Sequence, residues 1–295
     1  MSAEWPSIAD LLSDGEAEIA LLGAPLEAGS VTPGRCDLAP EAVRTALKRV
    51  SSYDLETGLE LSAPVRDLGD LPVRGLMPAD AFRPIRDGVE RAAAGHALTL
   101  LIGGNNAVTR PAAHGLGVPL EEVGLITLDA HFDLRATDQG PRNGNPIRCL
   151  LEDGLPGANI CQIGLAPFAN SAAMHRDALA AGIGIWTAAD VRREGILPVL
   201  DAALARIGHV GRIMVDFDID VIDRSQFPGA PGARPGGITV TDFFAAAREL
   251  GAAPRVALVD LTEFDPSLDA TDLSALTAAR WVAEILAGFS MRQAA

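Results

Sequence analysis

The stretch VGLITLDAHFD, residues 123–133, decides how this sequence folds. It begins with a nearly continuous apolar run and ends with polar side chains at alternate positions, Asp129, His131 and Asp133. Short apolar runs are typical of strands that are buried on both faces, as in parallel sheets covered by helices. Alternate side chains of an extended chain point to the same side. The stretch therefore predicts a buried strand whose end presents two carboxylates and an imidazole together.

Seven further apolar runs predict strands at residues 18–24, 64–70, 97–104, 159–165, 183–188, 212–218 and 256–262. Amphipathic stretches predict helices between most of them, for example at residues 40–50, 79–95, 189–208 and 272–288. Strands that alternate with helices indicate an α/β fold with a parallel sheet covered on both faces. No linker interrupts the pattern, so we expect one domain over residues 1–295. Eight strands fit either an open doubly wound sheet or a (β/α)8 barrel, and both folds place function at the carboxyl ends of the strands.

The composition excludes several classes of protein. The 295 residues carry a formal net charge of −15, and the arginines are scattered, so the basic footprint of a nucleic-acid binder is missing. No apolar run reaches the ~20 residues of a membrane span, and the acidic N-terminus lacks the pattern of a signal peptide. Cys36, Cys149 and Cys161 have no CxxC spacing, which favours reduced thiols. We expect a soluble cytoplasmic protein that acts on a small molecule and binds neither nucleic acids nor membranes.

A second acidic cluster follows another predicted strand. RIMVDFDID, residues 212–220, carries Asp216, Asp218 and Asp220 at alternate positions. Carboxylates crowded at a sheet edge repel one another, and a bound cation removes the conflict. Oxygen ligands with little nitrogen and no sulfur favour hard cations such as Mn²⁺ or Mg²⁺, and this many carboxylates permit two cations with shared ligands. The alternative is that these residues cap the following helices, but two clusters at equivalent strand ends favour the metal site.

Two polar loops offer further candidates. GGNNAVTRP, residues 103–111, follows a predicted strand, and Asn105 or Asn106 either points an amide into the same crevice or caps the next helix. PRNGNPIR, residues 141–148, carries Asn143 and Asn145, which either form a turn or face a ligand. From spacing alone, capping and turn formation are the favoured interpretations.

Charged residues near these motifs have two interpretations each. Arg135 and Arg148 either form ion pairs that offset the carboxylates or recognise a substrate carboxylate through the guanidinium group. Glu263, at the end of the last predicted strand, either caps a helix or pairs with a cationic substrate group. The remaining histidines are interpreted as structural or surface residues because they lie on predicted helices or helix ends: His96, His114, His175 and His209.

In this order, the motifs resemble the ureohydrolase family, which includes arginase, agmatinase and formimidoylglutamase. The resemblance covers roughly residues 18–288, and its motifs read GGNN, DAHFD, DFDIDVID and EFDP in this chain. It implies a three-layer α/β fold with a central eight-stranded parallel sheet that binds two Mn²⁺ ions at its carboxyl edge. It also implies a homo-oligomer, because trimers and hexamers are common in the family.

Within the family, the chain is most similar to formimidoylglutamase. DAHFDLR, with Arg135 directly after the metal motif, is similar to that branch, and so are NGNPIR (143–148), CQIGLAPFANS (161–171) and FPGAPGARPGG (227–237). Arginase and agmatinase usually carry a histidine where this chain has Asn143. The resemblance implies hydrolysis of N-formimidoyl-L-glutamate to L-glutamate and formamide, a step of histidine degradation. Two alternatives stay open: hydrolysis of another amidine or guanidino compound, and a non-catalytic member whose metal site has decayed.

Transferred by position, the resemblance gives each candidate residue a role. The metal ligands would be Asp129, His131, Asp133, Asp218 and Asp220. A hydroxide bridging two metal ions would attack the substrate, and Asp133 would pass a proton to the leaving amine. Glu263 would face the cationic formimidoyl group. The pocket for the glutamate end would be lined by Arg135, Arg148, Asn143 and Asn145.

One position departs from the family pattern. Relatives normally place a metal-binding histidine where this chain has Asn106, and a neutral amide oxygen is a weaker donor than imidazole. Asn106 is therefore expected to be a weak or absent ligand, which leaves the second metal site loosely bound. Asp216 stands where many relatives have serine, and Arg224 where they have proline. Extra negative charge from Asp216 is one hypothesis for how the missing histidine is compensated.

Overall fold

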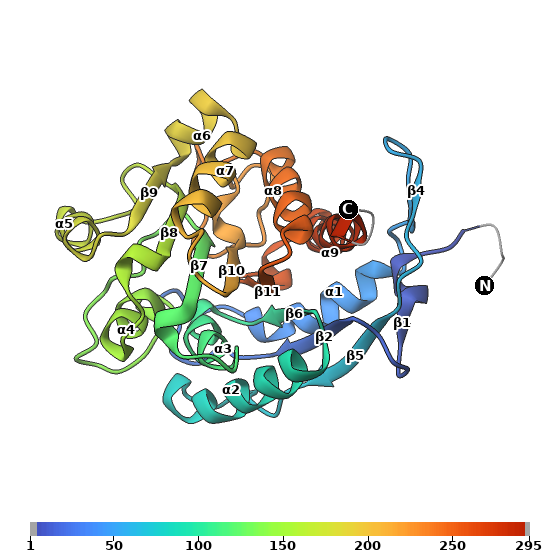
Figure 1. The fold of residues 1–295 in the computed structure, drawn as a ribbon, viewed down its shortest axis with the longest axis horizontal. Coiled ribbons are helices and arrows are strands. Elements are labelled where there is room, and N and C mark those ends of the chain that lie inside the picture. Colours follow the sequence, from blue (N-terminus) through green and yellow to red (C-terminus); the bar gives the residue numbers. More distant parts are fainter. Residues whose placement is uncertain (1–4, 293–295) are drawn as a thin grey trace.

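A computed structural model describes residues 5–292 and shows a parallel sheet between two layers of helices (Figure 1). The nine strands follow one another across the sheet in the order β1-β5-β2-β6-β11-β10-β7-β8-β9. Their bounds are β1 (Leu12–Ser13), β2 (Ile19–Ala24), β5 (Val65–Asp70), β6 (Leu98–Gly103), β7 (Val123–Leu128), β8 (Ile160–Leu165), β9 (Gly184–Thr187), β10 (Arg212–Asp218) and β11 (Val256–Thr262). A separate antiparallel pair consists of β3 (Tyr53–Asp54) and β4 (Leu59–Glu60).

All eight predicted strands are present, and the three-layer α/β fold is confirmed. The ninth strand, β1, pairs with β5 over only two residues, which is too short to produce a periodic sequence signal. In the described chain the sheet ends at β1 on one side and β9 on the other. It is therefore open, and the barrel alternative is wrong.

The helices divide into two groups that cover opposite faces of the sheet (Figure 1). One layer contains α1 (Ala39–Leu47), α6 (Ala188–Glu194), α7 (Ile196–Arg206), α8 (Val240–Ala252) and α9 (Leu273–Arg292). The other contains α2 (Pro78–Gly95), α3 (Thr109–His114), α4 (Pro146–Asp153) and α5 (Ala172–Ala181). The single helix predicted at residues 189–208 is two helices, because the chain turns at Gly195 with a φ of 85°.

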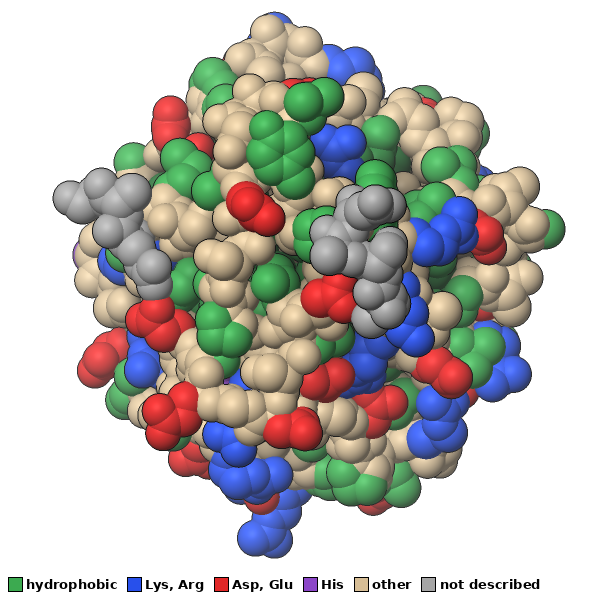
Figure 2. Space-filling model, turned by 90° about the vertical axis from the view of Figure 1, so that its right-hand side faces the viewer, with side chains coloured by type: hydrophobic (Ala, Val, Ile, Leu, Met, Phe, Trp, Pro, Cys, Tyr) green, Lys and Arg blue, Asp and Glu red, His purple; other side chains and the backbone are tan. Residues whose placement is uncertain are grey.

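Short 3₁₀ helices occur at several strand and helix ends: η1 (Ile8–Leu11), η2 (Cys36–Leu38), η3 (Asn106–Val108), η4 (Leu120–Glu122), η5 (Gly157–Asn159), η6 (Ile219–Val221) and η7 (Pro266–Leu268). One of them, η6, directly follows the central strand β10, and η3 begins three residues after the end of β6. No helix within residues 5–292 is both long enough and apolar enough to cross a membrane. On the face turned toward the viewer in Figure 2, acidic and basic side chains alternate with apolar ones and do not form a patch of one sign.

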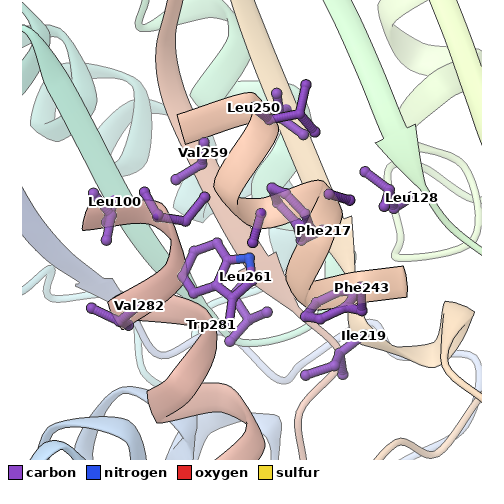
Figure 3. Packing of buried hydrophobic residues seen from close by; sticks show 14 of the residues in the cluster. Leu100, Leu128, Phe217, Ile219, Phe243, Leu250, Val259, Leu261, Trp281 and Val282 are labelled. Carbon is purple, nitrogen blue, oxygen red and sulfur yellow. The ribbon is translucent and has the colours of Figure 1, made fainter. Parts of the chain in front are cut away.

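An aromatic cluster fixes the centre of the sheet against the α8–α9 layer (Figure 3). Phe217 on β10 meets Phe243 of α8 and Trp281 of α9 edge to face, with ring centroids 5.4 Å apart in both pairs. All three side chains are fully buried. Large aromatic side chains contribute much of the burial energy of a core. The cluster therefore anchors β10 one residue before its polar end.

The four central strands β6, β11, β10 and β7 end at the same edge of the sheet. Since all their pairings are parallel, the residues that follow each strand lie next to one another. These are the loops that begin at residues 104, 129, 219 and 263. In open α/β sheets, ligands bind in the crevice outside the carboxyl ends of the strands. The fold thus brings together four motifs that the sequence spreads from residue 103 to residue 266.

Candidate metal centre

The DAHFD motif forms a tight turn after β7. Asp129 is buried, and its Oδ1 accepts a hydrogen bond of 2.6 Å from the backbone N–H of His131. Asp133 adopts a φ of 53°, which is uncommon for a residue with a side chain. Asn170, from the loop after β8, clamps the turn: its Oδ1 accepts from Phe132 N at 2.8 Å, and its Nδ2 donates to Ala130 O at 2.9 Å. The turn is therefore held rigidly by a neighbouring loop.

Three side chains converge at this point. Asp220, from η6 after β10, places Oδ2 3.0 Å from His131 Nδ1, and Asp129 Oδ1 is 3.5 Å from the same nitrogen. Within residues 5–292, these three form the group whose ligand atoms all lie within 4.8 Å of one another. Asp218, which ends β10, accepts a hydrogen bond from the backbone N–H of Asp220 at 3.0 Å. Imidazole and carboxylate ligands of this kind suit a hard or borderline cation.

Two observations show that these residues fit a cation. Asp129 Oδ2 is buried and has no hydrogen-bond partner in the described chain. Gly232 leaves room beside the group, because a Cβ there would lie 2.1 Å from Asp220 Oδ2 and 3.4 Å from His131 Cε1. A buried carboxylate oxygen without a partner is costly. A metal ion would satisfy this oxygen.

The pKa values of the clustered acids also favour a bound cation. Burial raises the pKa of Asp129 to about 6 and raises the pKa values of Asp133 and Asp218 well above the usual range. The Asp220 carboxylate raises the pKa of His131 to about 12. Burial opposes ionisation of Asp220, but the imidazolium of His131 lowers its pKa overall. In the absence of a cation the cluster therefore retains protons, which a metal ion would displace.

Asn106 lies at the centre of the site with its amide nitrogen toward the acids. Nδ2 donates to Asp218 Oδ2 at 3.0 Å and to Asp133 Oδ2 at 3.2 Å, and Asp216 Oδ2 is 3.4 Å away. Its Oδ1 accepts from the Thr109 hydroxyl at 2.6 Å. In this arrangement the side chain donates to metal-ligand candidates and turns its own ligand atom away. That Asn106 is a weak or absent ligand stays a prediction.

A layer of polar side chains lies beneath the metal-ligand residues. Asp216 and Asp260 are register partners on β10 and β11, and both are fully buried. Thr109 Oγ1 is 3.0 Å from Asp260 Oδ2, and Thr262 Oγ1 is 3.4 Å from Asp216 Oδ1. Burial raises the pKa of Asp260 to about 7 and that of Asp216 well above its ordinary value. Two adjacent buried carboxyls favour holding a proton, which reduces the negative charge that Asp216 can add to the centre.

Glu263 reaches the site from the end of β11. It has a φ of 59°, and strained backbone of this kind is concentrated at functional sites. Its Oε1 accepts from Asn106 N at 2.8 Å and from Asn143 Nδ2 at 3.0 Å. Asn143 Oδ1 in turn accepts from Val31 N at 2.8 Å, so the amide links Glu263 to the loop after β2. Burial raises the pKa of Glu263 to about 7, although these hydrogen bonds oppose the shift.

These residues open into one cavity of about 230 Å³. One wall carries the acidic side chains and the candidate metal ligands that reach the cavity: His131, Asp133, Asp218, Asp220 and Glu263. Two guanidinium groups, Arg135 and Arg234, also line it, and so do the following neutral residues: Val31, Thr32, Asn143, Gly144, Ala169, Asn170, Ser171, Met174 and Gly232. Among the predicted pocket residues, the structure therefore brings Arg135, Asn143 and Glu263 to the cavity.

Two predicted substrate-binding residues lie outside the cavity lining, and this corrects the sequence-based expectation. Asn145 is buried in its own loop, where Oδ1 accepts from Arg142 N at 2.7 Å and Nδ2 donates to two backbone carbonyls at 3.1 Å each. Arg148 donates to Leu134 O at 3.2 Å and forms an ion pair with Asp177. Asn145 therefore stabilises its own loop, and Arg148 forms an ion pair. These contacts agree with the two alternatives of a turn former and an ion pair.

Three site residues escaped the sequence analysis: Asn170, Gly232 and Arg234. They lie in loops without periodicity, and the only signal for them is the similarity of the segments 161–171 and 227–237 to the formimidoylglutamase branch. The four other histidines contact residues that are not candidate ligands: His96 with Ala92 O, His114 with Asp153, His175 with the Phe132 ring and His209 with Asn159. The three cysteines are buried and unpaired.

Comparison with known proteins gives the site its context. A model of the arginase family matches residues 17–288. The chain belongs to the arginase family. It is 32% identical to the formimidoylglutamase of Halalkalibacterium halodurans over 274 residues, which cover 91% of this chain and 86% of the relative. The formimidoylglutamase of Bacillus subtilis is 30% identical over 278 residues, covering 92% and 87% of the two chains.

Solved structures agree with this placement in the arginase family. The crystal structure of Bacillus subtilis formimidoylglutamase superimposes with a TM-score of 0.91 at 28% identity and covers 99% of this chain and 94% of that one. The structure of Trypanosoma cruzi formiminoglutamase with Mn²⁺ has a TM-score of 0.90 at 24% identity, covers 98% and 100% of the two chains, and thus shares the fold. As a member of the arginase family with these relatives, the protein is a metal-dependent hydrolase.

Proposed function

We propose that this arginase-family protein hydrolyses N-formimidoyl-L-glutamate to L-glutamate and formamide with manganese as its metal. One observation carries the proposal: a single cavity joins a wall of candidate metal ligands and Glu263 to two guanidinium groups. That combination suits a substrate with a cationic amidine at one end and carboxylates at the other. The similarity to two bacterial formimidoylglutamases at 30% identity or more supports the same substrate.

The metal would be held by side chains from two central strands, namely Asp129, His131, Asp133, Asp218 and Asp220. When bound, Mn²⁺ would act as a Lewis acid and would lower the pKa of a metal-bound water molecule to about 7. We propose two ions, of which one binds weakly because Asn106 directs Nδ2 rather than Oδ1 toward the acids. Manganese is supported by the oxygen-rich ligand set and by its presence in the Trypanosoma cruzi structure of the same fold.

Glu263 would orient the amidine. The formimidoyl group is cationic when protonated, and the carboxylate of Glu263 is held toward the cavity by Asn106 N and Asn143 Nδ2. Both hydrogen bonds go to Oε1, so Oε2 is left for the substrate. A carboxylate in a buried site attracts an amidinium strongly because the local dielectric is low. Glu263 therefore favours one orientation of the reacting carbon.

Asp133 would transfer a proton to the leaving nitrogen of the substrate. Hydrolysis adds water across the formimidoyl carbon, breaks the bond to the glutamate nitrogen and requires a proton on that leaving nitrogen. Asp133 lines the cavity beside the other candidate ligands. As a carboxylate it would accept the proton that the attacking water loses and pass it to the leaving nitrogen. The proton that the amine needs as the carbon–nitrogen bond breaks would thus come from the water, by way of Asp133.

Arg135 would bind a substrate carboxylate. Its guanidinium is exposed to the cavity and has no ion-pair or hydrogen-bond partner among residues 5–292. Gly144 makes room for it, because a Cβ at Gly144 would lie 2.7 Å from Arg135 Cδ. A cationic amine such as that of agmatine would be repelled at this position. The free guanidinium therefore favours an acidic substrate.

The alternative of a decayed, non-catalytic site is opposed by the same geometry. The five predicted ligands remain clustered and buried or half-buried, and Asp129 Oδ2 still lacks a protein partner. Keeping several carboxylates buried without a metal would cost stability. We also propose that the protein is a cytoplasmic homo-oligomer, a trimer or hexamer, which light scattering of the purified protein would test.

A substrate panel tests the proposed function. The purified protein, titrated with Mn²⁺, is expected to release glutamate and formamide in equal amounts from N-formimidoyl-L-glutamate, and to act far more slowly on agmatine and 4-guanidinobutyrate. Turnover of a guanidino compound in preference to formimidoylglutamate would contradict the proposal. E263Q should lower kcat/KM by about 10- to 100-fold, the cost of losing a charged hydrogen bond. E284Q, in an ion pair with Arg248 outside the cavity lining, serves as the matched control.

A further inference from the structure

Arg234 is a second guanidinium in the cavity, and the sequence analysis gave it no role. It lies in the loop that joins η6 to α8, whereas Arg135 lies in the loop after β7. Its Nη1 donates to Gly232 O at 2.7 Å and is 3.3 Å from Ala233 O. In the described chain, no carboxylate pairs with it. Nε and Nη2 therefore keep their N–H groups available for a ligand.

The loop that carries Arg234 is fixed rather than free. Arg224 Nη1 donates to Ala230 O at 3.1 Å and lies 3.3 Å from Ala233 O, and the carboxylate of Asp223 accepts from Gly236 N at 2.6 Å. A bridge between Ile222 and Ile238 closes the base of the loop. A guanidinium on a fixed loop loses little conformational entropy when it binds a ligand.

Arg234 lies in the same cavity as the acidic side chains, yet no carboxylate of the described chain pairs with it. Gly232, whose carbonyl holds the guanidinium, packs directly against Asp220 and His131. The same cavity contains four carboxylates, yet Arg234 bonds only to backbone oxygens. An arginine fork that is left open in a polar cavity matches the planar geometry of a carboxylate.

We propose that Arg234 binds one carboxylate of the substrate while Arg135 binds the other, so that the cavity selects amidines with two carboxylates. The inference rests on the proposed function and deepens it, since formimidoylglutamate carries an α- and a γ-carboxylate. A monocarboxylate would leave one guanidinium without a partner. The two arginines come from different loops, so each is expected to recognise a different end of the glutamate portion.

A set of substrates and variants tests this assignment. The substrates are N-formimidoyl-L-glutamate, N-formimidoyl-L-glutamine, which lacks the γ-charge, and 4-(formimidoylamino)butanoate, which lacks the α-carboxylate. R135Q and R234Q should each lose about 10- to 100-fold in kcat/KM on formimidoylglutamate. Each variant should lose little on the analogue that lacks the carboxylate it binds, so the two patterns should cross. Equal losses by R234Q on all three substrates would overturn the proposal.

R148Q is the matched control, because Arg148 pairs with Asp177 outside the cavity lining. It should leave kcat/KM for all three substrates close to wild type, whereas a purely structural role for Arg234 would lower kcat/KM equally for all three in R234Q. A binding measurement separates this inference from the proposed function. Calorimetry with glutarate and with butanoate on the Mn²⁺-loaded protein should show about tenfold weaker glutarate binding in R234Q and unchanged butanoate binding.

The outcomes of the two tests can be told apart. If formimidoylglutamate is not hydrolysed but glutarate binding depends on Arg234, the proposed function fails and the dicarboxylate site stands. If formimidoylglutamate is hydrolysed and neither its kcat/KM nor glutarate binding changes in R234Q, the function stands and the role of Arg234 is refuted.

Discussion

Replacing Gly232 with alanine should weaken metal binding without touching any ligand. A Cβ at this position would lie 2.1 Å from Asp220 Oδ2, whereas ordinary contacts begin at 3.4 Å. The carboxylate would therefore have to move by about 1.3 Å if the backbone stays in place. Asp220 is buried, and its Oδ2 is 3.0 Å from His131 Nδ1, so this movement separates two of the metal ligands.

Metal sites tolerate errors of only about 0.2 Å in ligand distance. Changes that displace a ligand through its surroundings typically cost 10- to 100-fold in metal affinity. G232A should therefore bind Mn²⁺ about 10- to 100-fold more weakly, which corresponds to about 1.4–2.7 kcal/mol.

Calorimetric titration with Mn²⁺ measures this change directly, with circular dichroism to show that the metal-free variant is folded. G211A is the control, because no heavy atom beyond its chain neighbours lies within 4 Å of a Cβ added there. Its Mn²⁺ affinity should equal that of the wild type. A folded G232A with wild-type affinity would refute the position of Asp220 in the metal centre.

Three further perturbations have defined outcomes. N106H should tighten one class of Mn²⁺ site and leave the other unchanged in a calorimetric titration, because an imidazole would replace an amide that now donates to Asp133 and Asp218; equal affinities in both proteins would contradict this. The Mn²⁺ affinity should rise at least tenfold per pH unit between pH 6 and 8. His131, with its pKa raised to about 12, holds one proton that the metal must displace, and the raised pKa values of Asp133 and Asp218 make the dependence steeper; an affinity independent of pH would exclude this account. F217A should lower the free energy of unfolding by about 3–5 kcal/mol in urea titrations, because it removes the ring that packs against Trp281 and Phe243. A loss below about 1 kcal/mol would show that the cluster does not anchor β10.

Much of the fold could be predicted because the buried strands leave a strong signal. The strands β2, β6, β7, β8, β10 and β11 are buried almost throughout, and their sequences are therefore short apolar runs. The two-residue β1 leaves no such signal. The break at Gly195 escaped prediction because the residues on both sides of it are helical, so the amphipathic pattern continues through the turn.

The clustering of the candidate ligands could be predicted for a different reason, whereas their role as ligands stays a prediction. Asp129, His131, Asp133, Asp218 and Asp220 lie at or just after the ends of two neighbouring parallel strands, so the sheet brings them together. Side chains on loops depend on contacts that the local sequence does not contain. Arg148 turns to Asp177 on α5, and Asn106 takes its orientation from Thr109 and from acids on two other segments. Arg234 reaches the cavity only because Arg224 and Asp223 fix its loop.

The most direct test of the metal centre is anomalous X-ray diffraction at the manganese edge from crystals grown with Mn²⁺. A strong peak bounded by Asp129, His131 and Asp220 is predicted, with a second, weaker peak on the side of Asp133, Asp218 and Asn106. No peak at this edge of the sheet, in a preparation that hydrolyses formimidoylglutamate in the presence of Mn²⁺, would contradict the assignment of these residues as the metal centre.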